Sequence, residues 1–390
     1  MNDYFDALET RSPEEREAQQ FLQLREQLRH AKANIPAYAD LLQGVDPESI
    51  TDRSALVKLP VTRKSEMAQA QAKMPPLGGY TDLQGKTLPR VFASPGAIFE
   101  PQANTEDFWR TARALHAAGC REGDLVYNTF SYHFTPAGFM LESGAHALGC
   151  TVFPAGIGQT ELQVQAMGHL RPQFYVGTPS FLKILLAKAK EMQIDVSSLR
   201  LGLVSGEALP EPLRLELSEN GVEVLQAYAT ADVGLIGFES ESREGLLLDE
   251  EILLEIVRPG TGDPVEPGTD ELATSPSVTL RLWRRVRRVS PPPPPPPAAV
   301  NAAVSASPSS PAPLASVAPT LTLLDLRLAL GRDDASEAWQ VTVFPAQRPA
   351  GREQVGHLRD CLNRMLQAEQ QAQVHLQAQE QAGALRPPPP

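Results

Sequence analysis

The residues whose types could do chemistry gather in five short segments of the chain. Together they offer hydroxyls, carboxylates, aromatic rings and an imidazole, and we expect them in loops of an α/β fold. In open α/β sheets, ligands bind outside the carboxyl ends of the strands, so these segments form the predicted site. The segments are Ser94–Glu100, Ser131–Thr135, Gly177–Ser180, Ser205–Pro210 and Tyr228–Gly234.

The elements that must position these segments alternate between strands and helices from Thr105 to Val257. Short apolar runs such as Leu125–Phe130 and Leu199–Val204 are separated by amphipathic helices such as Ser180–Met192. This alternation predicts βαβ units with a mainly parallel sheet, which is the α/β fold class. The other predicted elements are helices at 106–118, 138–148 and 161–170 and strands at 151–154 and 174–176.

An N-terminal helix is predicted ahead of this region. Ser12-Pro13-Glu14-Glu15 has the pattern of a capping box with proline at the first helical position, so a helix should run from there to about Ala33. After Pro36 we expect irregular chain until about Ala103.

The composition of the chain changes near residue 275. Residues 291–320 are rich in proline, alanine and serine and cannot bury a core, which predicts a linker without regular structure. Order is expected to return in a small, degenerate C-terminal α/β subdomain. The predicted parts are an N-terminal domain at 1–275, the linker at 276–320, the subdomain at 321–376 and a low-complexity tail at 377–390.

The overall composition excludes several classes of protein. A formal net charge of −12 argues against a nucleic-acid partner or an anionic membrane, because both reward a clustered basic surface. The three cysteines have no CxxC spacing, and Cys120 and Cys150 are expected as small core residues. The first residues lack the apolar core of a signal peptide, and no window of eighteen residues is apolar enough to span a membrane. We therefore expect a cytoplasmic protein.

Six stretches of the chain carry a resemblance to a known family. They are SPEEREAQQFLQLREQLRHAKANIPAYADLL, LPVTRKSEM, FASPGAIFEPQ, VGTPSFLKILL, LVSGEALPEPLR and YATADVGLIGFESE. In this order, over residues 4–275, the chain resembles the phenylacetate–CoA ligase family, the AMP-forming acid–CoA ligases of the adenylate-forming superfamily. The resemblance implies the large multi-layer N-terminal domain of that superfamily. It also implies activation of a carboxylic acid by Mg²⁺ and ATP to an acyl-adenylate, transfer to coenzyme A and, by analogy, a homodimer.

By this resemblance, Ser205, Gly206 and Glu207 lie along the adenine ring. Gly206 suits that place because its missing side chain lets the backbone approach a flat ring closely. The alternative is a plain glycine turn, with Glu207 beginning the next helix as an acid favoured by the helix dipole. Tyr228 would stack on the adenine.

Two further residues of the last segment are candidates for the phosphates and the metal. Thr230 offers a hydroxyl to a phosphate, and Asp232 offers a hard oxygen to Mg²⁺, which takes few protein carboxylates beside phosphate oxygens and water. The chain departs from the family pattern Tyr-Gly-x-Ser/Thr-Glu at Ala229 and Ala231. Asp232 has a second interpretation as a cap for the segment that follows.

Ser94 and Gly96 occupy the place of the family's phosphate-binding loop. That loop supplies several backbone amides, hydroxyls and a lysine to the phosphates, whereas here Pro95 cannot donate and no lysine follows before Arg110. An ordinary Ser-Pro-Gly turn explains the same residues.

The acyl pocket of the family corresponds to Tyr132, His133, Phe134, Gly177 and Pro179. Aromatic residues here suit an aromatic acid, and His133 could orient the carboxylate at the carboxyl edge of the sheet. A lone loop histidine is otherwise a surface or structural residue.

Other motifs of the family are missing. The string at 260–263, GTGD, has the context of a turn, and no aspartate suited to the ribose hydroxyls follows it. The hinge and its lysine-rich segment are absent, and the last lysine in this sequence is Lys190. The family pattern ends at SPSVTLRLWRRVRRVSPPPPPPP. A shift of reading frame in the gene, or divergence of the sequence, would explain this break. The sequence therefore predicts an acid–CoA ligase with weak or no adenylation. The alternative is a non-catalytic nucleotide- or acyl-binding protein that keeps the large domain.

Overall fold

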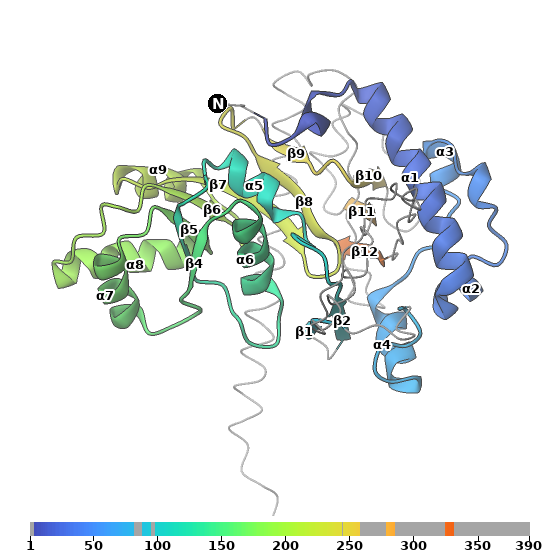
Figure 1. Ribbon diagram of the computed structural model, residues 1–390, viewed down its shortest axis with the longest axis horizontal. Coiled ribbons are helices and arrows are strands. Elements are labelled where there is room, and N and C mark those ends of the chain that lie inside the picture. The colour runs from blue at the N-terminus through green and yellow to red at the C-terminus, as the bar shows by residue number, and fades with distance from the viewer. Residues whose placement is uncertain are drawn as a thin grey trace, which may run out of the picture.

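A mainly parallel sheet forms the centre of the fold. A computed structural model of the chain describes residues 4–81, 88–94, 98–243, 245–257, 278–284 and 324–330 (Figure 1). The sheet has seven strands in the order β4-β3-β5-β6-β7-β8-β9; those from β4 to β7 run parallel, and β8 and β9 are antiparallel. The predicted α/β class is confirmed. The strands are β3 (Leu125–Asn128), β4 (Thr151–Pro154), β5 (Phe174–Gly177), β6 (Leu201–Val204), β7 (Glu223–Thr230), β8 (Gly234–Glu239) and β9 (Leu246–Leu248).

Helices cover both faces of this sheet because successive strand residues point to opposite sides. Val126 packs in one core cluster with Leu115 and Met140, whereas its neighbour Tyr127 packs in another cluster with Leu185. The first face carries α5 (Thr111–Ala117) and α6 (Ala137–Ala147), and the second carries α7 (Thr160–Leu170), α8 (Pro179–Met192) and α9 (Glu211–Glu219). The predicted helices at 138–148, 161–170 and 180–192 thus agree with α6, α7 and α8 to within a residue.

The N-terminal helices lie at the other end of the molecule, around the strand β10 (Ile252–Val257) (Figure 1). The predicted capping box is confirmed: the Ser12 hydroxyl accepts from the Glu15 amide at 3.1 Å, and the Ser12 amide donates to the Glu15 carboxylate at 3.0 Å. Buried side chains of the helices pack against Leu253 of β10. The helices are α1 (Pro13–Asn34), α2 (Pro36–Leu41), α3 (Arg53–Leu56) and α4 (Lys64–Lys73), with the 3₁₀ turns Ala7–Thr10 and Pro47–Ser49.

The expectation of irregular chain from Pro36 to about Ala103 is wrong. This region holds α2, α3, α4 and a hairpin of β1 (Arg90–Ser94) and β2 (Ile98–Gln102). Helices of four to ten residues are too short to show a clear apolar period, and they form here because tertiary contacts bury Tyr38, Leu56 and Met67.

The helix predicted at 106–118 begins later, at Thr111. Asp107 and Arg110 adopt left-handed backbone conformations, with φ of 42° and 63°, so the chain turns before the helix starts. The Asp107 carboxylate then accepts hydrogen bonds from the amides of Thr111 at 2.9 Å and Ala112 at 3.0 Å. The early residues of the predicted helix are therefore its cap.

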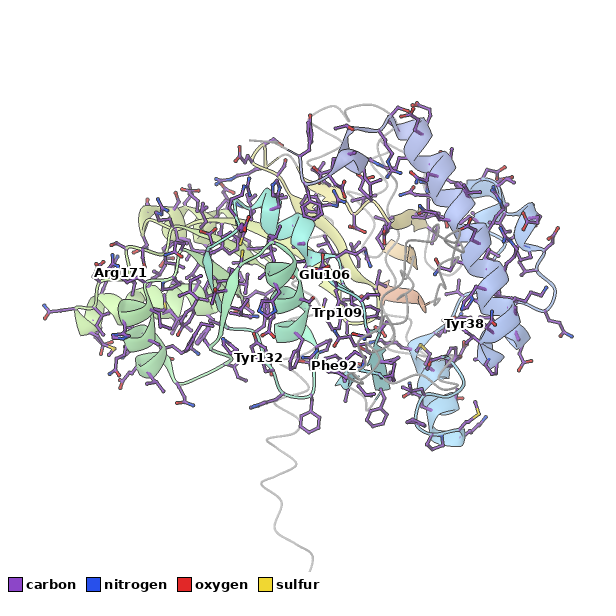
Figure 2. All side chains as sticks on the ribbon, in the orientation of Figure 1. Tyr38, Phe92, Glu106, Trp109, Tyr132 and Arg171 are labelled. Atoms are coloured by element: carbon purple, nitrogen blue, oxygen red, sulfur yellow. The ribbon has the colours of Figure 1, made fainter. Side chains whose placement is uncertain are left out.

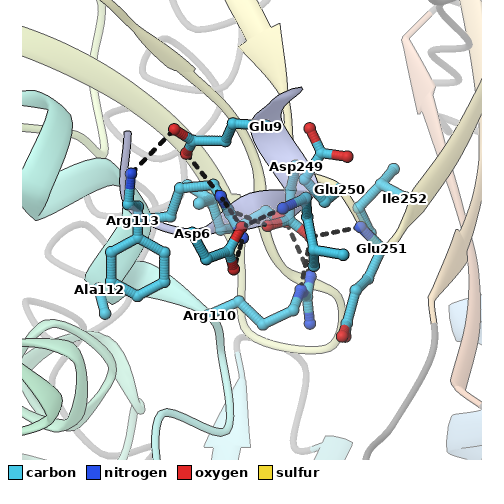
Figure 3. A network of polar contacts seen from close by, with 12 residues as sticks. Asp6, Glu9, Arg110, Ala112, Arg113, Asp249, Glu250, Glu251 and Ile252 are labelled. Atoms are coloured by element: carbon cyan, nitrogen blue, oxygen red, sulfur yellow. Dashed lines mark hydrogen bonds and ion pairs between the residues drawn. The ribbon is translucent and has the colours of Figure 1, made fainter. Parts of the chain in front are cut away.

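A network of ion pairs ties α5 to the N-terminal segment and to the turn before β10 (Figure 3). Arg113 pairs with Asp6 at 2.7 Å and with Glu9 at 2.5 Å, and Arg110 pairs with Asp249 at 2.7 Å. Since Arg113 and Asp249 are almost fully buried, these contacts fix the N-terminal segment against the sheet domain.

A second, three-stranded antiparallel sheet has the order β10-β11-β12. Its strand β11 (Val278–Arg284) lies inside the predicted linker. The expectation of no regular structure is therefore wrong for these seven residues. Their sequence, VTLRLWR, alternates between apolar and polar residues as a strand does. The sheet's strand β12 (Leu324–Leu330) lies inside the predicted C-terminal subdomain. The rest of the linker and subdomain, the tail and the 260–263 string lie outside the described residues, so the domain division stays a prediction. No helix in the described ranges is long and apolar enough to cross a bilayer.

The buried cap of α5 gives a testable pH dependence. Burial raises the pKa of Asp107 to about 6, although hydrogen bonds from the Ala112 and Thr111 amides oppose the shift. The folded protein therefore holds this proton at a higher pH than the unfolded chain, so ionisation destabilises the fold as the pH rises. Relative to Asp107→Asn, the free energy of unfolding of the parent protein should fall by up to ~3 kcal/mol between about pH 4 and pH 7. Urea unfolding at a series of pH values measures this difference.

Asp195→Asn is the matched control. Asp195 is exposed, and hydrogen bonds from Ser197 and Arg171 lower its pKa to about 2. The difference in free energy of unfolding between this variant and the parent should therefore change with pH in the opposite direction, and only below about pH 4. A difference between the parent and Asp107→Asn that does not change with pH would contradict the role of Asp107.

Candidate active site at the carboxyl edge of the sheet

Four of the predicted segments meet at the carboxyl edge of the parallel strands, as expected. The Ser205 amide after β6 donates to the Gly177 carbonyl of β5 at 3.1 Å, and the Thr129 amide after β3 donates to the Val176 carbonyl at 2.9 Å. Loops that follow neighbouring strands are therefore joined by their own backbones. The structure brings together segments separated by about a hundred residues of sequence.

The segment after β6 is held by a buried carboxylate. Glu207 accepts a hydrogen bond from the Ser180 amide at 2.6 Å, in the first turn of α8. Glu207 thus caps the helix of the neighbouring segment, where the dipole favours an acid, and it does not begin α9, which starts at Glu211. Gly206 is exposed with φ of +81°, a conformation that favours glycine. The proposed contact of Ser205, Gly206 and Glu207 with adenine stays a prediction.

Gly177 and Pro179 are buried parts of the scaffold. A Cβ atom on Gly177 would lie 2.0 Å from the Thr129 hydroxyl and 2.3 Å from the Tyr175 hydroxyl. The glycine therefore leaves room for a chain of hydrogen bonds, in which Thr129 donates to Tyr175 at 2.8 Å and Tyr175 donates to the Thr178 carbonyl at 3.0 Å. Pro179 is the buried first residue of α8.

The segment after β3 divides into a packed residue and two exposed ones. The Tyr132 hydroxyl donates to the Glu142 carboxylate and accepts from the Asn128 amide, both at 2.8 Å. His133 and Phe134 are exposed, and the Phe134 carbonyl accepts from the Ala93 amide of β1 at 2.9 Å. Tyr132 therefore anchors the segment, and His133 and Phe134 are the residues that can reach a ligand.

A row of aromatic rings connects this segment to the rest of the site. Tyr132 contacts Phe139 at a centroid distance of 5.1 Å, Phe139 contacts Phe92 of β1 at 5.4 Å, and Phe92 contacts Trp109 at 5.8 Å. Figure 2 labels Phe92, Trp109 and Tyr132, which lie near the middle of the molecule. The Trp109 indole then donates to the Ala231 carbonyl at 3.0 Å, so the row reaches the turn after β7.

The turn after β7 is held by contacts from the residues just before α5. Arg110 donates to the carbonyls of Val233 at 2.9 Å and Leu235 at 2.8 Å. Thr230 uses its hydroxyl within the turn, where it accepts from the Val233 amide at 3.2 Å. Tyr228 is buried, with 5% of its surface exposed. Both residues therefore contribute to the structure of the turn, and their contacts with a nucleotide stay predictions.

Asp232 in this turn belongs to a charged cluster that joins three distant segments. The Lys64 ammonium lies 2.8 Å from the Asp232 carboxylate and 3.1 Å from the Glu100 carboxylate. It also donates to the Ser94 hydroxyl at 3.3 Å. Lys64 from α4 thus links the hairpin that carries the predicted phosphate loop to the residue predicted to bind the metal. Gly96 lies outside the described residues.

Two groups of the cluster, Glu100 and Lys64, have shifted pKa values. Burial and repulsion by Asp232 raise the pKa of Glu100 to about 7, although Lys64 lowers it. For Lys64, burial lowers the pKa, but attraction to Asp232 and Glu100 outweighs it and holds the pKa above its ordinary value. Both acids are almost fully buried, so the ammonium stabilises charges that water no longer reaches.

Lys64 was missed as a site residue from the sequence. It lies in the LPVTRKSEM stretch, 168 residues before Asp232, and no strand precedes it. The structure places it through α4, whose Gln71 side chain accepts from the Phe99 amide and donates to the Phe99 carbonyl, both at 2.8 Å. This pairing holds α4 along β2, a contact that no local pattern predicts.

Glu100 and Asp232 fit a magnesium ion that also takes ligands from a nucleotide. Both are hard oxygen donors, and the buried Oε2 atom of Glu100 has no hydrogen-bond partner among the described residues. In the same part of the chain, no group of three or more His, Cys, Asp or Glu residues is arranged to hold a metal. Two carboxylates without a complete protein cage are typical of magnesium sites completed by phosphate oxygens and water.

The chain matches a family model, curated proteins and solved structures. The family model of the AMP-binding enzymes matches residues 102–270. A phenylacetate–coenzyme A ligase of Pseudomonas putida is 30% identical over 69% of this chain and 65% of its own length, and one of Aromatoleum evansii is 29% identical over 67% and 62%. The structure of a 2-hydroxyisobutyryl-CoA ligase with a bound adenylate, 21% identical, has the same fold with a TM-score of 0.66, covering 73% of this chain and 62% of that one.

The fold and the AMP-binding region define an adenylate-forming protein. Within that superfamily, the curated relatives that the chain matches are phenylacetate–coenzyme A ligases. The chain spans less than two thirds of the length of these relatives.

Replacing Lys64 tests the charged cluster. Lys64→Gln removes the cation that lies against both buried carboxylates, so it should lower the free energy of unfolding by about 1–3 kcal/mol. Adding Asp232→Asn should recover part of this loss, because one of the two like charges is then gone. Urea unfolding of the single and double variants measures both effects.

Lys183→Gln is the matched control, because Lys183 also pairs with a glutamate at 2.8 Å but at an exposed site, where it is 51% exposed. Its effect should stay within about 0.5 kcal/mol. If Lys64→Gln and Lys183→Gln lowered the free energy of unfolding by the same amount, the charged cluster would not be buried as described.

Proposed function

We propose that this protein is an AMP-forming acid–CoA ligase that binds ATP and a carboxylic acid at the carboxyl edge of the sheet. The acid carboxylate would attack the α-phosphate of ATP to give an acyl-adenylate and pyrophosphate. The thiol of coenzyme A would then displace AMP and give the acyl-CoA. The similarity of the chain to phenylacetate–coenzyme A ligases supports this reaction.

The observation that carries the proposal is the position of Lys64. Its ammonium lies against Ser94 at the phosphate loop and against Asp232 in the turn after β7. In this proposal Asp232 and Glu100 hold Mg²⁺, which neutralises phosphate charge when it is bound. Lys64 then takes the place of the lysine that the phosphate loop lacks, and its charge favours the triphosphate.

The remaining proposed contacts with ATP and the acid lie along the same carboxyl edge of the sheet. Ser205, Gly206, Glu207 and Tyr228 would contact the adenine, and Thr230 and Ser94 the phosphates. We propose an aromatic acid because the matched relatives are phenylacetate–coenzyme A ligases and because Phe134 presents an exposed ring beside His133. ATP, coenzyme A and an organic acid are small metabolites of the cytoplasm, where we place the reaction. By analogy with relatives, the protein would act as a homodimer.

We further propose that turnover is slow in this chain. No lysine follows Lys190, and no ribose-binding aspartate follows the 260–263 string. Loss of groups that stabilise developing charge commonly reduces rates by orders of magnitude. The same observation favours the second candidate, a protein that binds nucleotide or acyl groups without turnover.

Acid-dependent exchange of pyrophosphate into ATP tests adenylation directly across a panel of aromatic and aliphatic acids. We expect weak exchange, highest with aryl acids and dependent on Mg²⁺. Exchange close to that of full-length relatives would overturn the proposed impairment. Calorimetric binding of ATP without any exchange would favour the non-catalytic candidate, and no binding of ATP would overturn both.

The role of Lys64 is tested by ATP affinity. Lys64→Gln should weaken ATP binding by about tenfold to a hundredfold, because it removes a charge-assisted contact with phosphate. AMP affinity should change much less, since AMP lacks the β- and γ-phosphates. Calorimetry on the folded variant, with Lys183→Gln as the control, measures both ligands. Equal losses for ATP and AMP would contradict a specific contact with the outer phosphates.

A further inference from the structure

Two helices of the fold end in the same way and place a cysteine at the same position. α5 closes with the sequence His116-Ala-Ala-Gly-Cys120, and α6 closes with His146-Ala-Leu-Gly-Cys150. Each glycine is left-handed, with φ of +89° and +79°. The cysteine amides donate to the Leu115 and Ala145 carbonyls, both at 3.0 Å, five residues back. This is the Schellman closure of a helix, and it fixes both cysteine backbones.

The two caps bring the cysteine side chains into contact. α5 and α6 lie on the same face of the sheet and lead into the neighbouring parallel strands β3 and β4. The Sγ atoms of Cys120 and Cys150 are therefore 3.4 Å apart, although the residues are 30 apart in sequence. Both side chains are buried free thiols, and Cys150 is the slightly more exposed, at 6% against 0% for Cys120.

We propose that Cys120 and Cys150 are a redox modification site that closes reversibly to an intrachain disulfide in the presence of a peroxide. The Cys150 thiolate attacks one oxygen of hydrogen peroxide and breaks the O–O bond, which gives a sulfenic acid and hydroxide. The Cys120 thiolate then attacks that sulfur, forms the S–S bond and releases a second hydroxide; the two protons that the thiols lost convert both hydroxides to water. Two thiols and one peroxide thus give one disulfide and two waters, and a dithiol reductant restores the thiols.

Geometry favours closure, whereas burial makes it slow. The sulfurs must approach from 3.4 Å to about 2 Å, and their backbones are already held by the two helix caps. Burial raises the pKa of both thiols, so little thiolate exists at neutral pH. We therefore expect oxidation over minutes to hours at millimolar peroxide.

The bond would join two helices that also support the site. Trp109 and Arg110, just before α5, support the turn that carries Asp232. Glu142 of α6 anchors the Tyr132 hydroxyl. A disulfide at the far edge of the sheet therefore restrains both supports of the site. The inference does not depend on the proposed ligase activity.

The test is peroxide oxidation of the intact chain, followed by alkylation in denaturant and peptide mass mapping. We expect a peptide pair linked through Cys120 and Cys150, with a mass loss of two hydrogen atoms that dithiothreitol reverses. The melting temperature should rise on the order of 5–10 °C, because the bond closes a loop of about thirty residues.

Cys361→Ala is the background for the experiment, because it removes the third thiol and leaves the pair in place. Cys150→Ala in that background should show neither the linkage nor the rise in melting temperature. The parent chain needs no substitution for the mapping, so the test holds even if Cys150→Ala folds poorly. Two alkylated cysteines after peroxide, or a sulfinic acid on either residue without a linkage, would overturn the proposal.

Discussion

The cost of burying two carboxylates beside each other is the constraint on which the site depends. Glu100 and Asp232 are both withdrawn from water, and each charge raises the free energy of the other. The Lys64 ammonium at 2.8 and 3.1 Å offsets that cost, and to do so α4 must lie along the hairpin of β1 and β2. One ion-pair cluster therefore joins the N-terminal helices, the phosphate-loop hairpin and the parallel sheet. The same arrangement provides a cation and two hard oxygens beside Ser94, which the sequence predicts as a phosphate contact.

A second set of contacts stabilises the site from the sheet side. The turn that carries Asp232 is bound by the Trp109 indole and the Arg110 guanidinium, and Arg110 is in turn paired with the buried Asp249. Aromatic contacts extend this support to Tyr132 at the other side of the site. The loops of the candidate site are thus positioned by packed rings and ion pairs, as functional loops are by a rigid scaffold.

Much of the scaffold was predictable because its signals are local. The strand at 151–154, the helices near 138–148 and 180–192 and the capping box at Ser12 follow from periodicity and capping residues, and the structure confirms them. Helices of four to ten residues between Pro36 and Ala103 were missed, since they owe their stability to packing. The helix at 106–118 was placed too early because a left-handed Arg110 has no reliable signature in sequence. β11 was missed because an arginine- and proline-rich context hid its alternating pattern.

By itself, the sequence determined the α/β class and the loops in which the candidate residues lie, because the alternation of strands and helices is a local pattern. The resemblance to a known family, and not spacing, made Asp232 a candidate metal ligand. The tertiary structure decided which of those residues are exposed and which are engaged in contacts within the protein. In the structure Glu207 caps a helix, Gly177 leaves room for buried hydroxyls and the Tyr132 hydroxyl anchors its segment. Each of these contacts involves another segment of the chain. The tertiary structure also brought Lys64 to Asp232 and Cys120 to Cys150. Such contacts arise from packing between elements, and the spacing of residues along a chain does not encode them.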